Sequence, residues 1–214
     1  MYFNIVGNQY FLIALLLLMP PLQEVNSRQS NLESKKQTVE DSEEYVVLSR
    51  LLITQYDHKD IKSFVIVEDT ASVQEASTFI GTVGGWIFSG AKRPEVEQET
   101  SADYDAKAQD SFILSNKLTL STPYHLVSAQ DLRQLFHRKG ESVDSREWKS
   151  FYEKYPGSSG IIAFSRVGFN KKRNQALVYV MHQSGLVGGS GVFYVLSKQS
   201  GFWEVQNQAV IWLS

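Results

Sequence analysis

The stretch QALVYVMHQSGLVGGSGVFYVLSKQSGFWEV, residues 175–205, decides the architecture of this chain. It holds two runs of β-branched, aromatic and aliphatic residues on either side of a glycine-rich segment, and a third run begins after Gln-Ser-Gly. Residues 176–181 are apolar at every position rather than at every second one. Because alternate side chains of a strand point to opposite sides, such a strand is buried on both faces or belongs to a strongly curved sheet.

Four strand-like runs of this kind fill the last quarter of the sequence. Their connections, GFNKKRN, QSGLVGGSG and QSG, are short and typical of turns. Short connections join antiparallel neighbours, whereas parallel strands need a crossover of a dozen or more residues. We therefore predict an α+β fold in which helices pack on a C-terminal four-stranded antiparallel meander. The predicted strands are residues 161–167, 175–182, 192–198 and 203–213.

Helical periodicity dominates the sequence before these strands. Thr38 is a candidate N-cap for an amphipathic helix that runs to about Gln55, with acidic residues in its first turn. Ser128 opens the sequence Ser-Ala-Gln-Asp, which is a capping box with Asp in place of Glu. Helices are predicted at residues 38–55, 94–109, 130–137 and 144–155, and further strands at 62–70 and 123–127.

The glycine-rich segment between residues 182 and 192 raises the question of a phosphate site. A phosphate-binding loop of the Walker type needs a Lys after its last glycine and a helix that follows, and neither is present. No Gly-x-Gly-x-x-Gly pattern fits either. We therefore interpret the segment as a wide hairpin connection whose glycines adopt positive φ.

The N-terminus has the character of an export signal. Residues 11–19 read FLIALLLLM, which is too short for a comfortable membrane span and fits the hydrophobic region of a signal peptide. No Lys or Arg precedes it and no small-x-small cleavage site follows, so an uncleaved signal anchor and a buried N-terminal helix stay open. The predicted organisation is a signal peptide or signal anchor at 1–22, a disordered tether at 23–37 and a single α+β domain at 38–214. The expected location is secreted or periplasmic, or membrane-anchored through the N-terminal segment.

Charge is distributed unevenly although the net charge is only −2. Residues 1–109 hold 9 basic and 16 acidic side chains, whereas residues 110–214 hold 12 and 7. Such halves either pack against each other or leave a basic surface for an anionic partner. Lys171, Lys172 and Arg173 lie at a predicted hairpin tip, where charge is solvated and discourages aggregation. No nucleic acid is expected as a partner, because the cluster lacks interleaved aromatic residues.

Arg166, His182 and Ser184 are the candidate ligand-binding residues. Arg166 lies among apolar neighbours in a predicted strand, so it reaches water, pairs with an acid from the N-terminal half, or binds an anionic ligand. His182 and Ser184 lie at one edge of the glycine-rich hairpin. The chain has no cysteine, no His-Glu-x-x-His and no Gly-x-Ser-x-Gly, so no catalytic residue, metal ligand or cofactor is predicted.

Residues 158–205 resemble a family of uncharacterised exported bacterial proteins. The matching features are Ser-Arg-Val-Gly-Phe-Asn at 165–170, Gln-Ala-Leu-Val-Tyr-Val at 175–180, the glycine-rich loop, and Gly-x-Trp-x-Val at 201–205. The resemblance implies export, a bacterial origin and one C-terminal fold unit, and it implies no activity. Many members carry two cysteines in the glycine-rich loop, where this chain has Ser184 and Gly188, so a redox or metal role of that loop does not apply here.

Together these features predict an exported, non-catalytic binding or interaction module at the cell envelope. Its partner is expected to be a protein or a small-molecule ligand, and membrane contact is expected only through an uncleaved N-terminal segment. Two alternatives stay open. One is a small hydrolase with a site near Arg166 and His182, and the other is an inhibitor or immunity-type protein.

Overall fold

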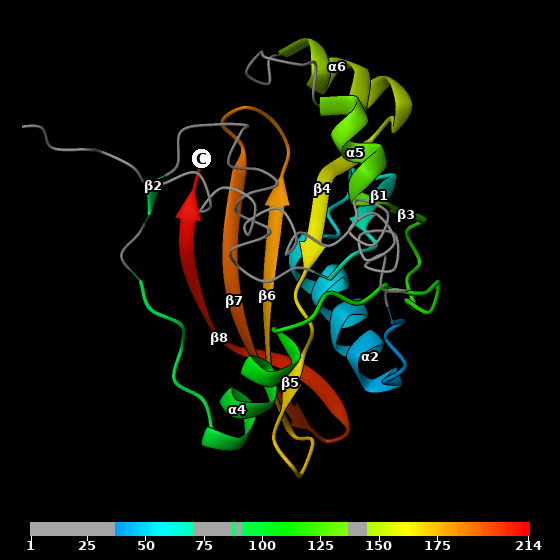
Figure 1. The fold of residues 1–214 in the computed structure, drawn as a ribbon. Helices are drawn as coiled ribbons and strands as arrows, with labels where there is room; N and C mark the ends of the chain where they lie inside the picture. Colours follow the sequence, from blue (N-terminus) through cyan, green and yellow to red (C-terminus); the bar gives the residue numbers. More distant parts are fainter. Residues whose placement is uncertain (1–36, 71–86, 89–90, 137–144) are drawn as a thin grey trace, which may run out of the picture. The chain divides into compact units, whose positions relative to one another are not determined.

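The four C-terminal runs form the antiparallel half of one larger sheet (Figure 1). The computed structural model describes residues 37–70, 87–88, 91–136 and 145–214, all within the compact unit Gln37–Ser214. The predicted signal segment at 1–22 and nearly all of the tether at 23–37 lie outside the described residues. The antiparallel strands lie in the order β8-β7-β6-β4 and are β4 (Ser158–Phe164), β6 (Gln175–Gln183), β7 (Gly189–Gln199) and β8 (Phe202–Leu213).

Parallel strands extend this sheet beyond β4. β1 (Ser63–Val67) pairs in parallel with β4 on one side and with β3 (Tyr124–Val127) on the other. At the opposite edge β2 (Ile87–Phe88) pairs antiparallel with β8. Away from this edge, the short strand β5 (Gly168–Phe169) pairs antiparallel with β6. The α+β class is confirmed, but the sheet is mixed with the order β2-β8-β7-β6-β4-β1-β3, and the predicted four-stranded antiparallel meander is wrong.

The physical reason for this difference lies in the connection between β3 and β4. Two helices, α5 (Ala129–Phe136) and α6 (Ser145–Lys154), lie between these strands in the chain. A helical crossover of this length allows β3 and β4 to run parallel with β1 between them. The sequence indicates each strand, but it does not indicate that β1 and β3 pair with the C-terminal set.

Helices cover both faces of the sheet. Helix α2 (Ser42–Leu51) packs on one face of the sheet, in the same apolar cluster as Val178 and Val180 of β6. Helices α5 and α6 pack on the other face, together with Leu177 and Tyr179. Residues 176–181 are therefore buried on both sides, as their continuous apolar character predicted.

Three helix ends show where the chain enters and leaves the helices α2 and α5. Asp41, not Thr38, caps α2, because its carboxylate accepts the backbone N–H of Glu43 at 3.0 Å. After Leu51 the chain continues as a π-helical turn, η1 (Leu52–Tyr56). The predicted cap of α5 is confirmed, since Ser128 Oγ accepts the N–H of Asp131 and donates to its carboxylate.

The glycine-rich segment is a hairpin connection between β6 and β7, as predicted. Ser184 closes it through two bonds to the Gly188 carbonyl, from its N–H at 2.6 Å and from its Oγ at 2.8 Å. The predicted reason for the glycines is wrong, because none of those between 182 and 192 has positive φ. At Gly191 the missing side chain provides space instead. A Cβ at Gly191 would overlap the Trp212 and Tyr179 side chains, whose Nε1 and hydroxyl form a 2.7 Å hydrogen bond.

Among the described residues, no helix combines the length and the apolar character that a membrane crossing requires.

Candidate functional site

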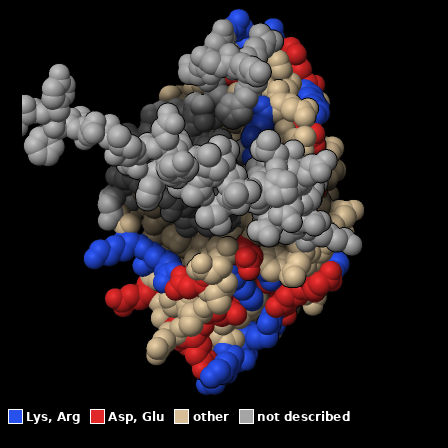
Figure 2. All heavy atoms as spheres, viewed as in Figure 1, with Lys and Arg blue, Asp and Glu red and all other residues tan. Residues whose placement is uncertain are grey.

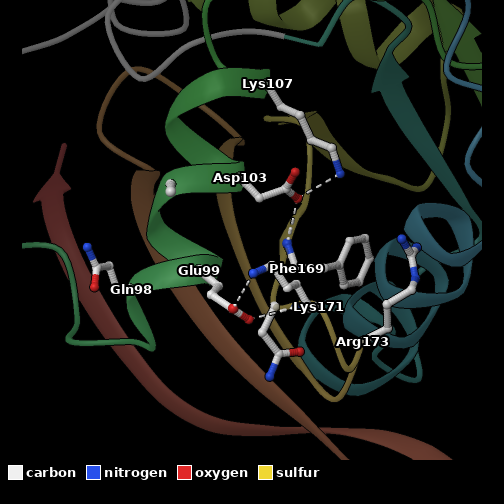
Figure 3. Close-up of a pocket in the computed structure, with 9 residues that line it drawn as sticks. Gln98, Glu99, Asp103, Lys107, Phe169, Lys171 and Arg173 are labelled. Carbon is white, nitrogen blue, oxygen red and sulfur yellow. Dashed lines mark hydrogen bonds and ion pairs between the residues drawn. The ribbon is translucent and has the colours of Figure 1, made fainter.

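A groove lies between helix α4 (Gln98–Lys107) and the turn that leads from β5 into β6 (Figure 3). Its volume is about 560 Å³, which lies within the range of small-molecule sites. Both walls are rich in charge. The lining residues are Gln98, Glu99, Ala102, Asp103, Lys107, Phe169, Asn170, Lys171 and Arg173.

The α4 wall is held in place mainly by polar bonds. The Asp103 carboxylate accepts the backbone N–H of Phe169 at 2.8 Å and pairs with Lys107 at 2.9 Å. One turn earlier, Glu99 accepts the backbone N–H of Lys171 and pairs with its ammonium group at 3.0 Å. Figure 3 shows these carboxylates pointing from the helix toward the turn. Only Thr100 and Tyr104 of this helix are buried, so apolar packing contributes less here than in the sheet.

The facing wall is shaped by an asparagine and by a close backbone contact. Asn170 Oδ1 accepts the N–H groups of Asn174 and Gln175, which closes the turn around a left-handed Arg173 with φ of 53°. Gly168 lies directly against α4, where a Cβ would come within 2.6 Å of the Tyr104 backbone nitrogen. The groove therefore depends on a glycine at this position.

An aromatic ring between two cations forms part of the lining. The Arg173 guanidinium lies 4.2 Å and the Lys107 ammonium 5.1 Å from the centre of the Phe169 ring. Both distances are within the range of cation–π attraction. Arg173 also bonds both oxygens of Asp41 through Nη2, at 2.7 and 2.8 Å. The turn is thereby tied to the N-terminus of α2.

The charges around the groove alternate in sign. Figure 2 shows Lys and Arg next to Asp and Glu over the part of this face that carries α4 and β5, rather than a patch of one sign. The hydrogen bond from Lys171 lowers the pKa of Glu99 below its usual range. Burial raises the pKa of Asp41, but the hydrogen bonds from Arg173 and from the Glu43 N–H outweigh burial, so this pKa is also lowered. Both carboxylates are ionised at neutral pH.

Arg166 forms a buried ion pair. Its Nε and Nη2 bond both oxygens of Glu44 at 2.9 and 2.7 Å, and its guanidinium lies 4.1 Å from the centre of the Phe112 ring. Glu44 also accepts the N–H of Val167. Of the three roles that the sequence left open for Arg166, the structure shows the pair with an acid from the N-terminal half. Burial alone would lower the pKa of Arg166, yet the bonds and charge of Glu44 raise it.

His182 and Ser184 are bonded to main-chain carbonyls. His182 Nε2 lies 2.6 Å from the Ser159 oxygen, and its ring packs edge-on against Tyr56. Burial lowers the pKa of His182, so the imidazole is neutral and its Nε2 donates to the carbonyl. The contacts of His182 and those of Arg166 share no residue in the described part of the chain. Arg166 and His182 therefore have different polar partners, whereas His182 and Ser184 lie at the same end of the β6–β7 hairpin.

Sequence reasoning missed the groove, although one signal pointed to it. The acidic segment that contains α4 and the basic turn at 171–173 do pack against each other, which confirms the first of the two readings of the uneven charge. The sequence predicted that Lys171, Lys172 and Arg173 all lie in water at the hairpin tip. The Arg173 guanidinium instead lies over the Phe169 ring and pairs with Asp41. Within the described ranges, no group of three or more His, Asp or Glu side chains could hold a metal ion.

Comparison with protein-family models, with curated proteins and with solved structures finds no match for this chain.

Proposed function

We propose that this protein is an exported, non-catalytic binding module whose ligand site is the groove between α4 and the β5–β6 turn. The observation that carries the proposal is the groove itself, an open hollow of about 560 Å³ with charged side chains on both walls. Ligand sites usually lie in pockets of this size in which a few polar groups point toward the same space.

The surroundings of the other candidate residues favour binding over hydrolysis. A hydrolase with a serine nucleophile needs a base within hydrogen-bond reach of that serine. Ser184 Oγ instead donates to the Gly188 carbonyl, and His182 Nε2 donates to the Ser159 carbonyl. Arg166 is held by Glu44 inside the protein.

Two variants of α4 test the location of the site. Ala102 is exposed and lines the groove, so Ala102→Trp fills the hollow without removing any ion pair. Ala106 is exposed one turn later on the same helix and does not line it, so Ala106→Trp is the matched control. Binding of the full chain to a panel of short peptides, oligosaccharides and anionic lipid vesicles is measured by calorimetry.

The proposal expects at least one ligand whose binding is lost in Ala102→Trp and kept in Ala106→Trp. It is wrong if every ligand that binds does so equally well to both variants. It is also wrong if the chain hydrolyses an ester or peptide substrate and His182→Ala abolishes this activity in a folded protein.

Export is tested separately, because it rests on the sequence and not on the groove. Residues 1–37 are fused to an alkaline phosphatase that lacks its own leader and is active only outside the cytoplasm. Phosphatase activity in intact bacteria supports export, and its absence with stable fusion protein contradicts it.

A further inference from the structure

The charged side chains that line the groove all have partners of opposite sign. Lys171 pairs with Glu99 at 3.0 Å, and Lys107 pairs with Asp103 at 2.9 Å. Arg173 pairs with Asp41, behind the turn, at 2.7 Å. The groove thus presents both signs of charge in balanced pairs, and a ligand that binds a carboxylate of the groove must compete with the cation already paired to it.

The pair most open to exchange is the one between Lys171 and Glu99. Their side chains are 86% and 45% exposed, whereas those of Lys107 and Asp103 are 20% and 37% exposed. Ion pairs between exposed side chains contribute little to stability, because water competes for both partners. Lys107 also bonds the Val167 carbonyl and lies 3.5 Å from Glu44, so its position is fixed by the fold.

We propose that the groove binds a zwitterion, meaning a small molecule or short peptide that carries both an ammonium group and a carboxylate. This inference rests on the binding role proposed above. The ligand carboxylate pairs with Lys171 and the ligand ammonium pairs with Glu99, so one weak internal pair is replaced by two intermolecular pairs.

Charge balance is the physical reason for this ligand class. A purely anionic ligand that takes Lys171 leaves Glu99 without its cation, and a purely cationic ligand that takes Glu99 leaves Lys171 without its anion. Each case gives up an existing interaction for each one gained. A zwitterion leaves neither side chain without a partner.

Arg173 supplies a further donor for the ligand carboxylate. It bonds both Asp41 oxygens through Nη2 alone, and no residue in the described part of the chain accepts a hydrogen bond from its Nε or Nη1. A guanidinium that stacks on an aromatic ring keeps its in-plane N–H groups directed outward. Lys171 and Arg173 therefore form the anion-binding side of the groove, and Glu99 forms the cation-binding side.

The experiment is calorimetric titration of the full chain at pH 6.5 with three probes. They are trialanine, which is zwitterionic, its N-acetyl derivative, which is anionic, and its C-terminal amide, which is cationic. We expect trialanine to bind, and each capped derivative to bind about tenfold more weakly, because each loses one charged contact.

Two variants of the exchangeable pair complete the cycle. In Glu99→Gln the partner of the ligand ammonium is gone, so trialanine and its N-acetyl derivative should bind with equal affinity. In Lys171→Gln the ligand carboxylate keeps only Arg173, so the preference for trialanine over its amide should be smaller than in the wild type. Lys172→Gln is the matched control, because Lys172 is exposed beside Lys171 but does not line the groove, and it should keep the wild-type preference.

The possible failures are distinguishable. If a capped probe binds the wild-type protein as tightly as trialanine does, and Ala102→Trp abolishes that binding, the zwitterion inference is overturned and the binding role stands. If no probe and no member of the ligand panel shows binding that depends on Ala102, the proposed function fails and this inference fails with it.

Discussion

Strand β6 and helix α4 are adjacent, but different forces hold them. In β6, residues 176–181 are fully buried between two helical layers, and the strand is paired along both edges. In α4 only two residues are buried, and carboxylates such as Asp103 and Glu99 bond the opposite wall. Apolar burial is insensitive to pH, whereas carboxylate bonds depend on ionisation. The centre of the sheet is therefore held by apolar burial, whereas the groove beside α4, a polar rim of the molecule, is held by ionised carboxylates.

The largest expected effect is on the apolar side of this comparison. Trp203 of β8 is buried against α2, and its Nε1 donates to Glu43 at 2.6 Å. Trp203→Ala should lower the free energy of unfolding by about 3–5 kcal/mol, because a large cavity is left behind. Urea denaturation measures this loss, and Trp203→Phe should recover much of it. An unchanged midpoint for Trp203→Ala would show that β8 does not belong to the core.

The buried ion pair between α2 and the chain that follows β4 gives an effect of similar size. The Arg166 and Glu44 side chains are 10% and 1% exposed, so Arg166→Met leaves a buried carboxylate without its main partner. The expected loss of stability is about 3–5 kcal/mol. Combining it with Glu44→Met should restore part of the loss, since no buried charge then remains. A double-mutant cycle by urea denaturation measures the coupling, and additive losses would contradict a buried pair.

A smaller effect is expected where α4 touches the sheet. Gly168→Ala places a methyl group against the Tyr104 backbone, and such overpacking costs about 1–3 kcal/mol. Faster hydrogen exchange of α4, with β6 unchanged, would show that the helix alone has moved. Gly185→Ala is the control, because no atom lies within 4 Å of the added methyl and the residue does not have positive φ. Equal effects of the two substitutions would refute the close contact.

The smallest effect is the dependence of the polar rim on pH. The pKa of Asp41 is lowered in the folded protein, so this group contributes stability above its unfolded pKa of about 3.9. That contribution is lost as the pH falls through the folded pKa. In Asp41→Asn the melting temperature should therefore fall less steeply below about pH 4 than in the wild type. If the melting temperatures of the two proteins fall equally steeply below about pH 4, the Arg173–Asp41 pair does not stabilise the fold.

Sequence patterns predicted elements better than they predicted partners. The burial of residues 176–181, the cap at Ser128 and the glycine-rich hairpin are confirmed, because each depends on local periodicity or on neighbouring residues. The parallel pairing of β1 with β3 and β4 was missed, because pairing across long connections leaves no local pattern. The cap of α2 was assigned to Thr38 instead of Asp41, since both are suitable residue types only three positions apart.

The candidate site shows the same division. An arginine among apolar residues can reach water, pair with an acid or bind an anionic ligand, and the sequence left these three roles open for Arg166. Which partner it has was decided by the packing of α2 on β4, which places Glu44 against it. The sequence shows that Glu99 lies in an acidic segment and Lys171 in a basic cluster, but it does not show that these two side chains pair across a groove.

By itself the sequence determined the α+β class, the strand that is buried on both faces, and the opposite charges of two segments. These segments, the acidic one that contains α4 and the basic turn at 171–173, pack against each other in the fold. These properties follow from side-chain periodicity and composition, which act over a few residues. Only the tertiary structure decided the mixed order of the sheet, the pairing of Arg166 with Glu44 and the groove between α4 and the β5–β6 turn. Such features arise from contacts between residues more than 100 positions apart, such as the 122 positions between Glu44 and Arg166, because distant segments become neighbours only when the chain closes on its core.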